Sequence, residues 1–173
     1  YAGELGWELH CPMKEMPKVY QALMTAGKTH GICLLGTYAM NSLRMEKAYR
    51  GWGSELTNEV TMIEGAMERF VDFNKDFIGK QGTLKSKQEG ARIQLVYCEV
   101  DALDNDSYGN EPVYKDGALV GITTGGAYGH AVGKSLAFAY VDPKFAAPGT
   151  EFDALMMGNM CKMRVLADCA WDP

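Results

Sequence analysis

The residues best suited to bind a ligand stand at the start of the chain, where residues 1–8 read YAGELGWE. Two carboxylates, Glu4 and Glu8, stand close to aromatic side chains in this stretch. A carboxylate can accept two parallel hydrogen bonds from the edge of a nitrogen-rich ring, and an aromatic side chain can stack on the same ring. Glycine lets the backbone approach such a ligand closely. The pattern favours a flat heterocyclic ligand, and the alternative is a polar turn that leads into a strand at residues 7–11.

Composition limits the classes of function. The 173 residues suffice for one large domain or two small ones, and the 47% apolar and 23% charged residues are ordinary for a globular protein. The formal net charge is −5 and the 17 basic residues are scattered, so we expect no nucleic-acid partner. The sequence contains no apolar run long enough to span a membrane, so we expect no membrane partner.

Cysteine and histidine usage argues against a disulfide framework and against a metal site. The five cysteines are odd in number and form no CxxC pair, and the three histidines are dispersed. Free thiols indicate a reducing compartment, which would be the cytoplasm or, in a eukaryote, the mitochondrial matrix.

Hydrophobic periodicity predicts mixed structure in the first half of the chain. The expected elements are a strand at 7–11, a helix at 14–26, a helix from Thr37 to about Ala48, a strand at 69–73 and a short helix at 77–85. Thr37 and Asp76 are the expected helix caps. The first helix carries an apolar stripe rich in methionine, which we expect to be part of a core.

The second half has the pattern of a β-structure. Strands are expected at 92–100 and 135–141, and hairpins at 113–123 and 151–165. Asp116-Gly117 supplies the positive φ angles that a tight hairpin turn requires. The composition changes near residues 87–90, so the predicted fold is α+β: a partial α/β domain over 1–88, followed by a small antiparallel β-barrel over 89–173.

Several segments in order resemble the folate-binding aminomethyltransferase family, of which the glycine cleavage T-protein is the best-known member. Residues 1–8 resemble the family signature Y-[TA]-G-E-x-G-[YW]-E. The further similar segments are 39–47, 49–56, 76–80, 121–126, 133–137, 148–150 and the terminal Asp172-Pro173. The resemblance covers essentially the whole chain.

Details within these segments resemble one branch of the family, the folate domain fused to flavin-dependent dimethylglycine or sarcosine dehydrogenases. These details are Asn41 in place of aspartate, Lys47 and the run YRGWG at 49–53. In the glycine cleavage T-proteins an arginine that contacts the folate tail usually occupies the position of Met40, so that contact is not expected here.

The resemblance implies tetrahydrofolate as cofactor, with Glu8 binding the pterin edge and Tyr1 lining the same cleft. Trp52 is the third candidate folate-binding residue, and the alternative is that it faces an interdomain seam. It implies that an upstream domain of the same polypeptide holds FAD and produces the one-carbon unit, which the folate captures as 5,10-methylenetetrahydrofolate. The family's proton-handling aspartate lies in its amino-terminal half and has no counterpart that we identify here. We therefore expect a carboxy-terminal fragment of a larger enzyme, inactive alone, with no catalytic residue of its own.

Two kinds of alternative remain. One is a stand-alone aminomethyltransferase similar to the T-protein, or a folate-dependent demethylase of another small methylated substrate. The other is a non-catalytic folate-binding or interdomain module.

Overall fold

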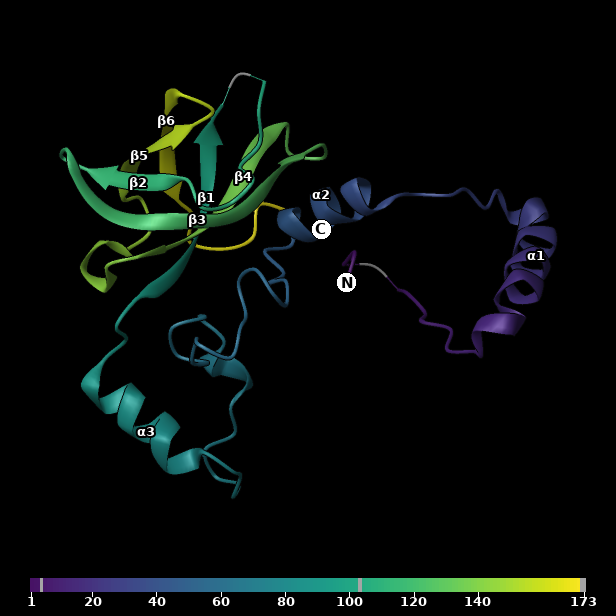
Figure 1. The fold of residues 1–173 in the computed structure, drawn as a ribbon, viewed down its shortest axis with the longest axis horizontal. Coiled ribbons are helices and arrows are strands. Elements are labelled where there is room, and N and C mark those ends of the chain that lie inside the picture. Colours follow the sequence, from purple (N-terminus) through teal and green to yellow (C-terminus); the bar gives the residue numbers. More distant parts are fainter. Residues whose placement is uncertain (4, 103, 172–173) are drawn as a thin grey trace.

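The computed structural model describes residues 1–3, 5–102 and 104–171, and its centre is a closed antiparallel β-barrel (Figure 1). The six strands are β1 (Gln94–Asp101), β2 (Pro112–Lys115), β3 (Ala118–Gly129), β4 (Lys134–Val141), β5 (Glu151–Met156) and β6 (Asn159–Val165). They are hydrogen-bonded in the order β1-β4-β3-β2-β5-β6, and β6 pairs with β1 to close the barrel. The predicted α+β fold with a small antiparallel barrel is confirmed.

Tight turns close two hairpins of the barrel, and the one at Asp116-Gly117 was predicted from the sequence. Asp116 and Gly117, with φ of 51° and 79°, join β2 to β3. Met157 and Gly158, with φ of 48° and 83°, join β5 to β6 in the same way. Positive φ at both central residues gives the turn the twist that antiparallel strands need, so these two dipeptides fix the register of their hairpins.

The barrel sheet is buried on two faces where it meets the rest of the chain. Inside the barrel, Val96, Phe152 and Met163 belong to one apolar cluster. On the outer face of β1 and β4, Tyr97 and Phe138 belong to a second cluster that includes Met45 and Ala48. Residues 135–141 of β4 are all buried, because alternate side chains point into these two clusters.

The described helices lie outside the barrel. The α-helices are α1 (Met16–Gly27), α2 (Thr37–Glu46) and α3 (Lys80–Glu89), and the 3₁₀ turns are η1 (Met13–Glu15), η2 (Lys28–His30), η3 (Glu68–Phe70) and η4 (Pro143–Phe145). The predicted domain boundary between residues 88 and 89 falls at the end of α3, and that division stays a prediction.

Two predicted strands and two predicted caps are wrong. Residues 7–11 form no strand, and 69–73 begin with η3, because neither segment pairs with another strand among the described residues. Gly36, in extended conformation, precedes α2, so Thr37 is its first residue and not its cap. Gly79, in left-handed conformation, precedes α3, and Asp76 instead forms an exposed ion pair with Lys80 at 3.4 Å.

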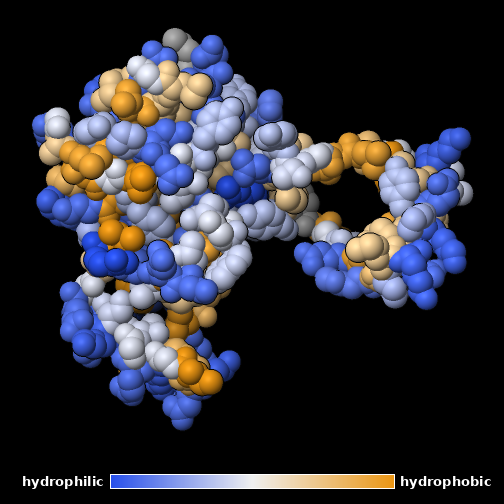
Figure 2. All heavy atoms as spheres, in the orientation of Figure 1, coloured by the Kyte–Doolittle hydropathy of each residue, from blue (hydrophilic) through white to orange (hydrophobic). Residues whose placement is uncertain are grey.

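The apolar stripe of α1 is exposed and not part of a core. No residue of α1 is buried, and Tyr20 and Leu23 are among the large apolar side chains that it exposes. Figure 1 shows α1 at the end of an arm that stands away from the barrel, and Figure 2 shows apolar residues on the surface of this arm, most clearly along the segment between α1 and α2. The prediction that this stripe is buried is therefore wrong for the described residues.

The described part of the chain contains no helix that is both long and apolar enough to cross a membrane. Within the same residues, no group of three or more histidine, cysteine or carboxylate side chains is arranged to hold a metal ion.

Hydrogen exchange on the chain of residues 1–173 is expected to separate α1 from α2. An isolated helix of 12 residues is marginal in water, so the amides of α1 are expected to exchange within about tenfold of the unfolded-chain rate. The 10-residue α2 is shorter but buries Ser42, Arg44, Met45 and Glu46, so its amides are expected to exchange at least ~100-fold more slowly. Equal protection of the two helices would contradict this assignment.

Candidate functional site

Helix α2 is fixed on the barrel by side chains that bond the backbone of β3. The Asn41 Nδ2 donates to the carbonyl of Gly126 at 3.0 Å, and the Ser42 hydroxyl donates to the carbonyl of Tyr128 at 2.5 Å. Gly126 has to be glycine at this contact, since a Cβ there would lie 2.5 Å from the carbonyl oxygen of Leu136. The position of the helix is thus set by two strand carbonyls.

The end of α2 is tied to the β3–β4 turn and to the end of the described chain. The buried Glu46 carboxylate accepts hydrogen bonds from the backbone N–H groups of Ala131 and Val132, at 2.6 and 3.3 Å. Its backbone carbonyl accepts from the N–H of Trp171 at 3.0 Å. Glu46 therefore has a structural role, with partners separate from those of Arg44.

A buried ion pair joins α2 to the loop that follows it. Arg44 Nη1 lies 2.8 Å from Glu55 Oε2, and the two side chains are 7% and 0% exposed. Glu55 Oε2 also accepts from the Gly51 N–H at 2.7 Å and the Ser54 hydroxyl at 2.9 Å, while Oε1 accepts from the Thr124 hydroxyl at 2.7 Å. A buried charge is tolerated only when it is paired and hydrogen-bonded, and this carboxylate has four donors.

The guanidinium of this pair is satisfied by its own helix and loop. Arg44 Nε donates to Asn41 Oδ1 at 2.8 Å, and Nη1 also donates to the Tyr49 carbonyl at 3.0 Å. Asn41 thus accepts from Arg44 with its oxygen and donates to Gly126 with its nitrogen. An aspartate at this position could accept but not donate, so the amide is the group that both contacts require.

The loop at 49–56 presents an aromatic side chain on a well-fixed backbone. The Gly53 N–H donates to the Leu56 carbonyl at 2.8 Å, and Trp52 forms an isolated β-bridge with Leu56. The Tyr140 hydroxyl donates to the Glu55 carbonyl at 2.7 Å from the barrel side. Trp52 remains 75% exposed on this loop, so its ring is free to contact a ligand.

The N-terminal residues lie against the same loop. The Tyr1 hydroxyl is 3.5 Å from the carbonyl oxygen of Arg50. Gly3 has φ of 87°, and a Cβ there would lie 2.5 Å from the Cγ of Lys47, so the backbone passes directly over that side chain. Glu4 of the signature lies outside the described residues. The structure thus brings Tyr1 to the loop that carries Trp52.

Glu8 does not join them in the described structure. Its side chain is 87% exposed and lies 3.5 Å from the ring nitrogen of His10, with which it can form an ion pair. Glu8 lies in the irregular segment that leads to η1, and it does not contact the loop that Tyr1 reaches. The folate-binding assignment of Tyr1, Glu8 and Trp52 stays a prediction.

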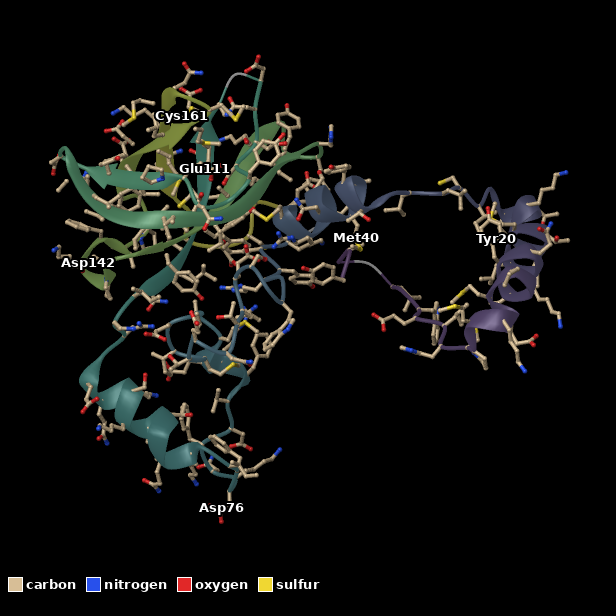
Figure 3. All side chains as sticks on the ribbon, in the orientation of Figure 1. Tyr20, Met40, Asp76, Glu111, Asp142 and Cys161 are labelled. Carbon is tan, nitrogen blue, oxygen red and sulfur yellow. The ribbon has the colours of Figure 1, made fainter. Side chains whose placement is uncertain are left out.

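A cleft of about 1150 Å³ lies beside the contact between α2 and the barrel. Its walls are α2, the segment 104–108 and the glycine-rich middle of β3. Asn105 Nδ2 is buried there without a hydrogen-bond partner among the described residues. Tyr1, Glu8 and Trp52 do not line this cleft, whereas Met40 lies on α2 outside it and is 37% exposed (Figure 3).

The sequence did not reveal the central role of Glu55. It stands inside the segment 49–56, which carries the family resemblance, but a carboxylate in a polar loop is ordinarily exposed. Its partner Thr124 is 69 residues away. A useful signal was available in the short polar side chains of Ser54 and Thr124, but only the fold brings them together.

Replacing Glu55 with glutamine is expected to destabilise the fold by about 3–5 kcal/mol, because Arg44 is left as an uncompensated buried charge. Urea unfolding would measure the loss. The control is Asp153→Asn, which removes the more exposed ion pair with Lys162 and is expected to change stability little. Equal effects of the two substitutions would show that the Arg44–Glu55 pair is not structural.

Asn41→Asp is expected to destabilise the protein by about 1–3 kcal/mol, because a carboxylate would face the Gly126 carbonyl without a proton to donate. Asn41→Ser, which shortens the side chain but adds no charge, serves as the comparison. Thermal unfolding would measure both variants. A neutral effect of aspartate would mean that the amide has no special function at this position.

Comparisons with known proteins agree with this architecture. Residues 1–75 match the model of the GCVT N-terminal domain, and residues 94–172 match that of the glycine cleavage T-protein C-terminal barrel domain. The crystal structure of glycine cleavage system aminomethyltransferase T from Bartonella henselae superposes with a TM-score of 0.76 at 21% identity. That superposition covers 90% of this chain and 44% of the other, and at this identity it supports the fold alone.

Two curated relatives are more similar in sequence. Mitochondrial dimethylglycine dehydrogenase of Mus musculus is 43% identical over 161 residues, which cover 92% of this chain and 18% of the mouse protein. An aminomethyltransferase of Desulforamulus reducens is 32% identical over 169 residues, covering 96% of this chain and 46% of that enzyme. The chain thus spans less than half the length of either relative. The two family models and the ordered motifs show that the chain belongs to the glycine cleavage T-protein family.

Proposed function

We propose that the chain is part of a folate-dependent aminomethyl-transfer module in an FAD-linked dimethylglycine or sarcosine dehydrogenase that makes 5,10-methylenetetrahydrofolate. The observation that carries the proposal is the difference in identity, 43% to dimethylglycine dehydrogenase of mouse against 32% to an aminomethyltransferase. The whole activity would also need the parts of such an enzyme that lie outside the aligned residues.

Residues on α2 support the dehydrogenase branch. Met40 occupies the position where the T-proteins usually carry an arginine, and it forms no charged contact with a folate tail. Asn41 replaces the usual aspartate, and its amide is used in both directions, toward Gly126 and toward Arg44. The departures from the T-protein pattern therefore fit this chain's own packing.

The available side chains suit a reduced pterin in their chemistry. The Glu8 carboxylate is exposed and has no buried partner, so it can accept two hydrogen bonds from the edge of the ring. Tyr1 and Trp52 have exposed aromatic faces on one loop region and can line the site. Bound tetrahydrofolate would supply the amine nitrogens that take up the one-carbon unit. The chain's residues would bind and orient it, and we assign no proton transfer to them.

The exposed face of α1 supports an upstream domain as partner. The helix buries none of its residues, yet it presents Met16, Tyr20 and Leu23 at helical spacing. Such a stripe is stable in water only when another surface covers it. We infer that an FAD-containing upstream domain of the same polypeptide provides that surface, and we place the protein in the cytoplasm or, in a eukaryote, the mitochondrial matrix.

The second candidate is a stand-alone aminomethyltransferase. The alignment with the Desulforamulus reducens enzyme covers 96% of this chain, against 92% for the mouse dehydrogenase, and this larger coverage favours the aminomethyltransferase. A dinucleotide-binding sequence in the same polypeptide would decide for the dehydrogenase.

Calorimetry with tetrahydrofolate on the intact protein tests the site. Glu8→Gln is expected to weaken binding roughly 10–100-fold, since a charge-assisted contact contributes about 1.5–3 kcal/mol. Glu15→Gln, which removes a half-exposed carboxylate from η1, is the control and is expected to bind normally. Unchanged affinity in Glu8→Gln would refute the assignment of the pterin contact.

A further inference from the structure

A second cavity, of about 590 Å³, lies between the 47–50 segment and β1. Its walls are residues 47–50, 94–97 and 165–169, together with side chains at 66 and 69. Three of the lining residues are basic, Lys47, Arg50 and Arg69, whereas Asp168 is the one lining carboxylate among the described residues. The volume lies within the ~300–1000 Å³ typical of small-molecule sites.

Arg50 enters this cavity without a carboxylate partner among the described residues. Its Nη1 and Nη2 donate to the carbonyls of Ala48 and Ala66, at 2.8 and 3.4 Å, and its guanidinium lies 5.6 Å from the centre of the Phe138 ring. Its Nε is buried and has no hydrogen-bond partner in the described part of the chain. A buried donor left unpaired costs about 1–3 kcal/mol, and a ligand oxygen that accepted a hydrogen bond from Nε would remove this cost.

The electrostatic surroundings of Arg50 point the same way. Burial lowers the pKa of its guanidinium, and the charge of Arg69 lowers it further, while the smaller influence of Glu55 and Tyr140 opposes them. The charged form of Arg50 is therefore less stable here than in water. An anion placed between the two arginines would relieve both effects.

Arg69 is the exposed member of the pair. Its guanidinium lies 4.8 Å from the centre of the Phe70 ring, and no described carboxylate forms an ion pair with it. Asp168, which also lines the cavity, accepts a hydrogen bond from the N–H of Cys169 at 2.9 Å. Neither Arg50 nor Arg69 forms an ion pair with this carboxylate in the described part of the chain.

Tyr97 adds a neutral donor to the same cavity. The side chain is 7% exposed, and its buried hydroxyl forms no hydrogen bond of normal geometry with a residue that the structure describes. The backbone of Ala170 is close enough to influence the hydroxyl, but burial is the larger effect and raises its pKa, so the hydroxyl keeps its proton. Two unpartnered buried donors, from Arg50 and Tyr97, therefore belong to one cavity.

We propose that this cavity binds the oxyanion group of a small ligand, a carboxylate or a phosphate, between the guanidinium groups of Arg50 and Arg69. Arginine presents a planar set of donors that matches two oxygens of either group. The Tyr97 hydroxyl supplies a third donor of neutral charge. Tyr1, Glu8 and Trp52 do not line the cavity, so this site is independent of the proposed pterin contact.

The test follows the Arg Nε–Hε signals of the intact protein by NMR during titration with sodium phosphate and, separately, with glutarate at constant ionic strength. Saturable shifts of the Arg50 and Arg69 signals are expected with at least one of the two anions. The Arg44 signal is the internal control and is expected to stay in place, since its guanidinium is already paired with Glu55. A response to phosphate alone identifies a phosphoryl ligand, and a response to glutarate a carboxylate.

Calorimetry on variants completes the test. Arg69→Gln, at an exposed position, is expected to fold normally and to bind the anion roughly tenfold more weakly. Lys28→Gln, which removes the same charge from η2, is expected to bind as wild type. Arg50→Lys keeps the charge but removes Nε, and a loss of affinity is expected there too. Equal affinity of wild type and Arg69→Gln overturns the proposal. So does the absence of a saturable shift with either anion.

Discussion

The buried carboxylate of Glu55 is the constraint on which the rest of the structure depends. A carboxylate with no exposed surface loses its hydration, and it is stable only if donors replace the water around both of its oxygens. Those donors come from α2 through Arg44, from the loop through Gly51 and Ser54, and from β3 through Thr124. Helix α2, the loop that follows it and the distant strand β3 must therefore meet at one point, and the requirement is directional, unlike apolar contact.

This meeting point gives the exposed side chains a rigid base. The loop that turns around Glu55 carries Arg50 and Trp52, two positions apart. The carbonyl of Arg50 lies 3.5 Å from the Tyr1 hydroxyl. The barrel contributes through the Tyr140 hydroxyl, which bonds the Glu55 carbonyl. Because contacts with Glu55 and Tyr140 fix the backbone of the loop, its exposed side chains are held in position for a ligand. The barrel is thus a support for the 49–56 loop.

Local signals in the sequence predicted the barrel and the three α-helices, but they predicted the strands, the helix caps and the burial of the first helix in the N-terminal half wrongly. The Asp116-Gly117 turn and the period-two strands that flank it depend on residues close in sequence, so they were recognised. Residues 7–11 have the same alternation but no partner strand in the described chain, and alternation alone does not make a strand. Glu55 could not be recognised, since its burial depends on Thr124. The resemblance suggested Glu8, Tyr1 and Trp52, and of these the geometry joins Tyr1 to the loop of Trp52.

Arg44 on α2 and Arg50 in the loop show how a structural arginine differs from one that can bind a ligand. Arg44 and Arg50 both leave water and both lie near Glu55, but Glu55 Oε2 contacts only Arg44. Arg44 has a carboxylate and two further acceptors, as a charge kept for stability requires. Arg50 has two carbonyls and an aromatic ring, which satisfy part of its donors but supply no opposite charge among the described residues. Of the two arginines, Arg50 is therefore the one with donor capacity left for the oxyanion proposed for its cavity.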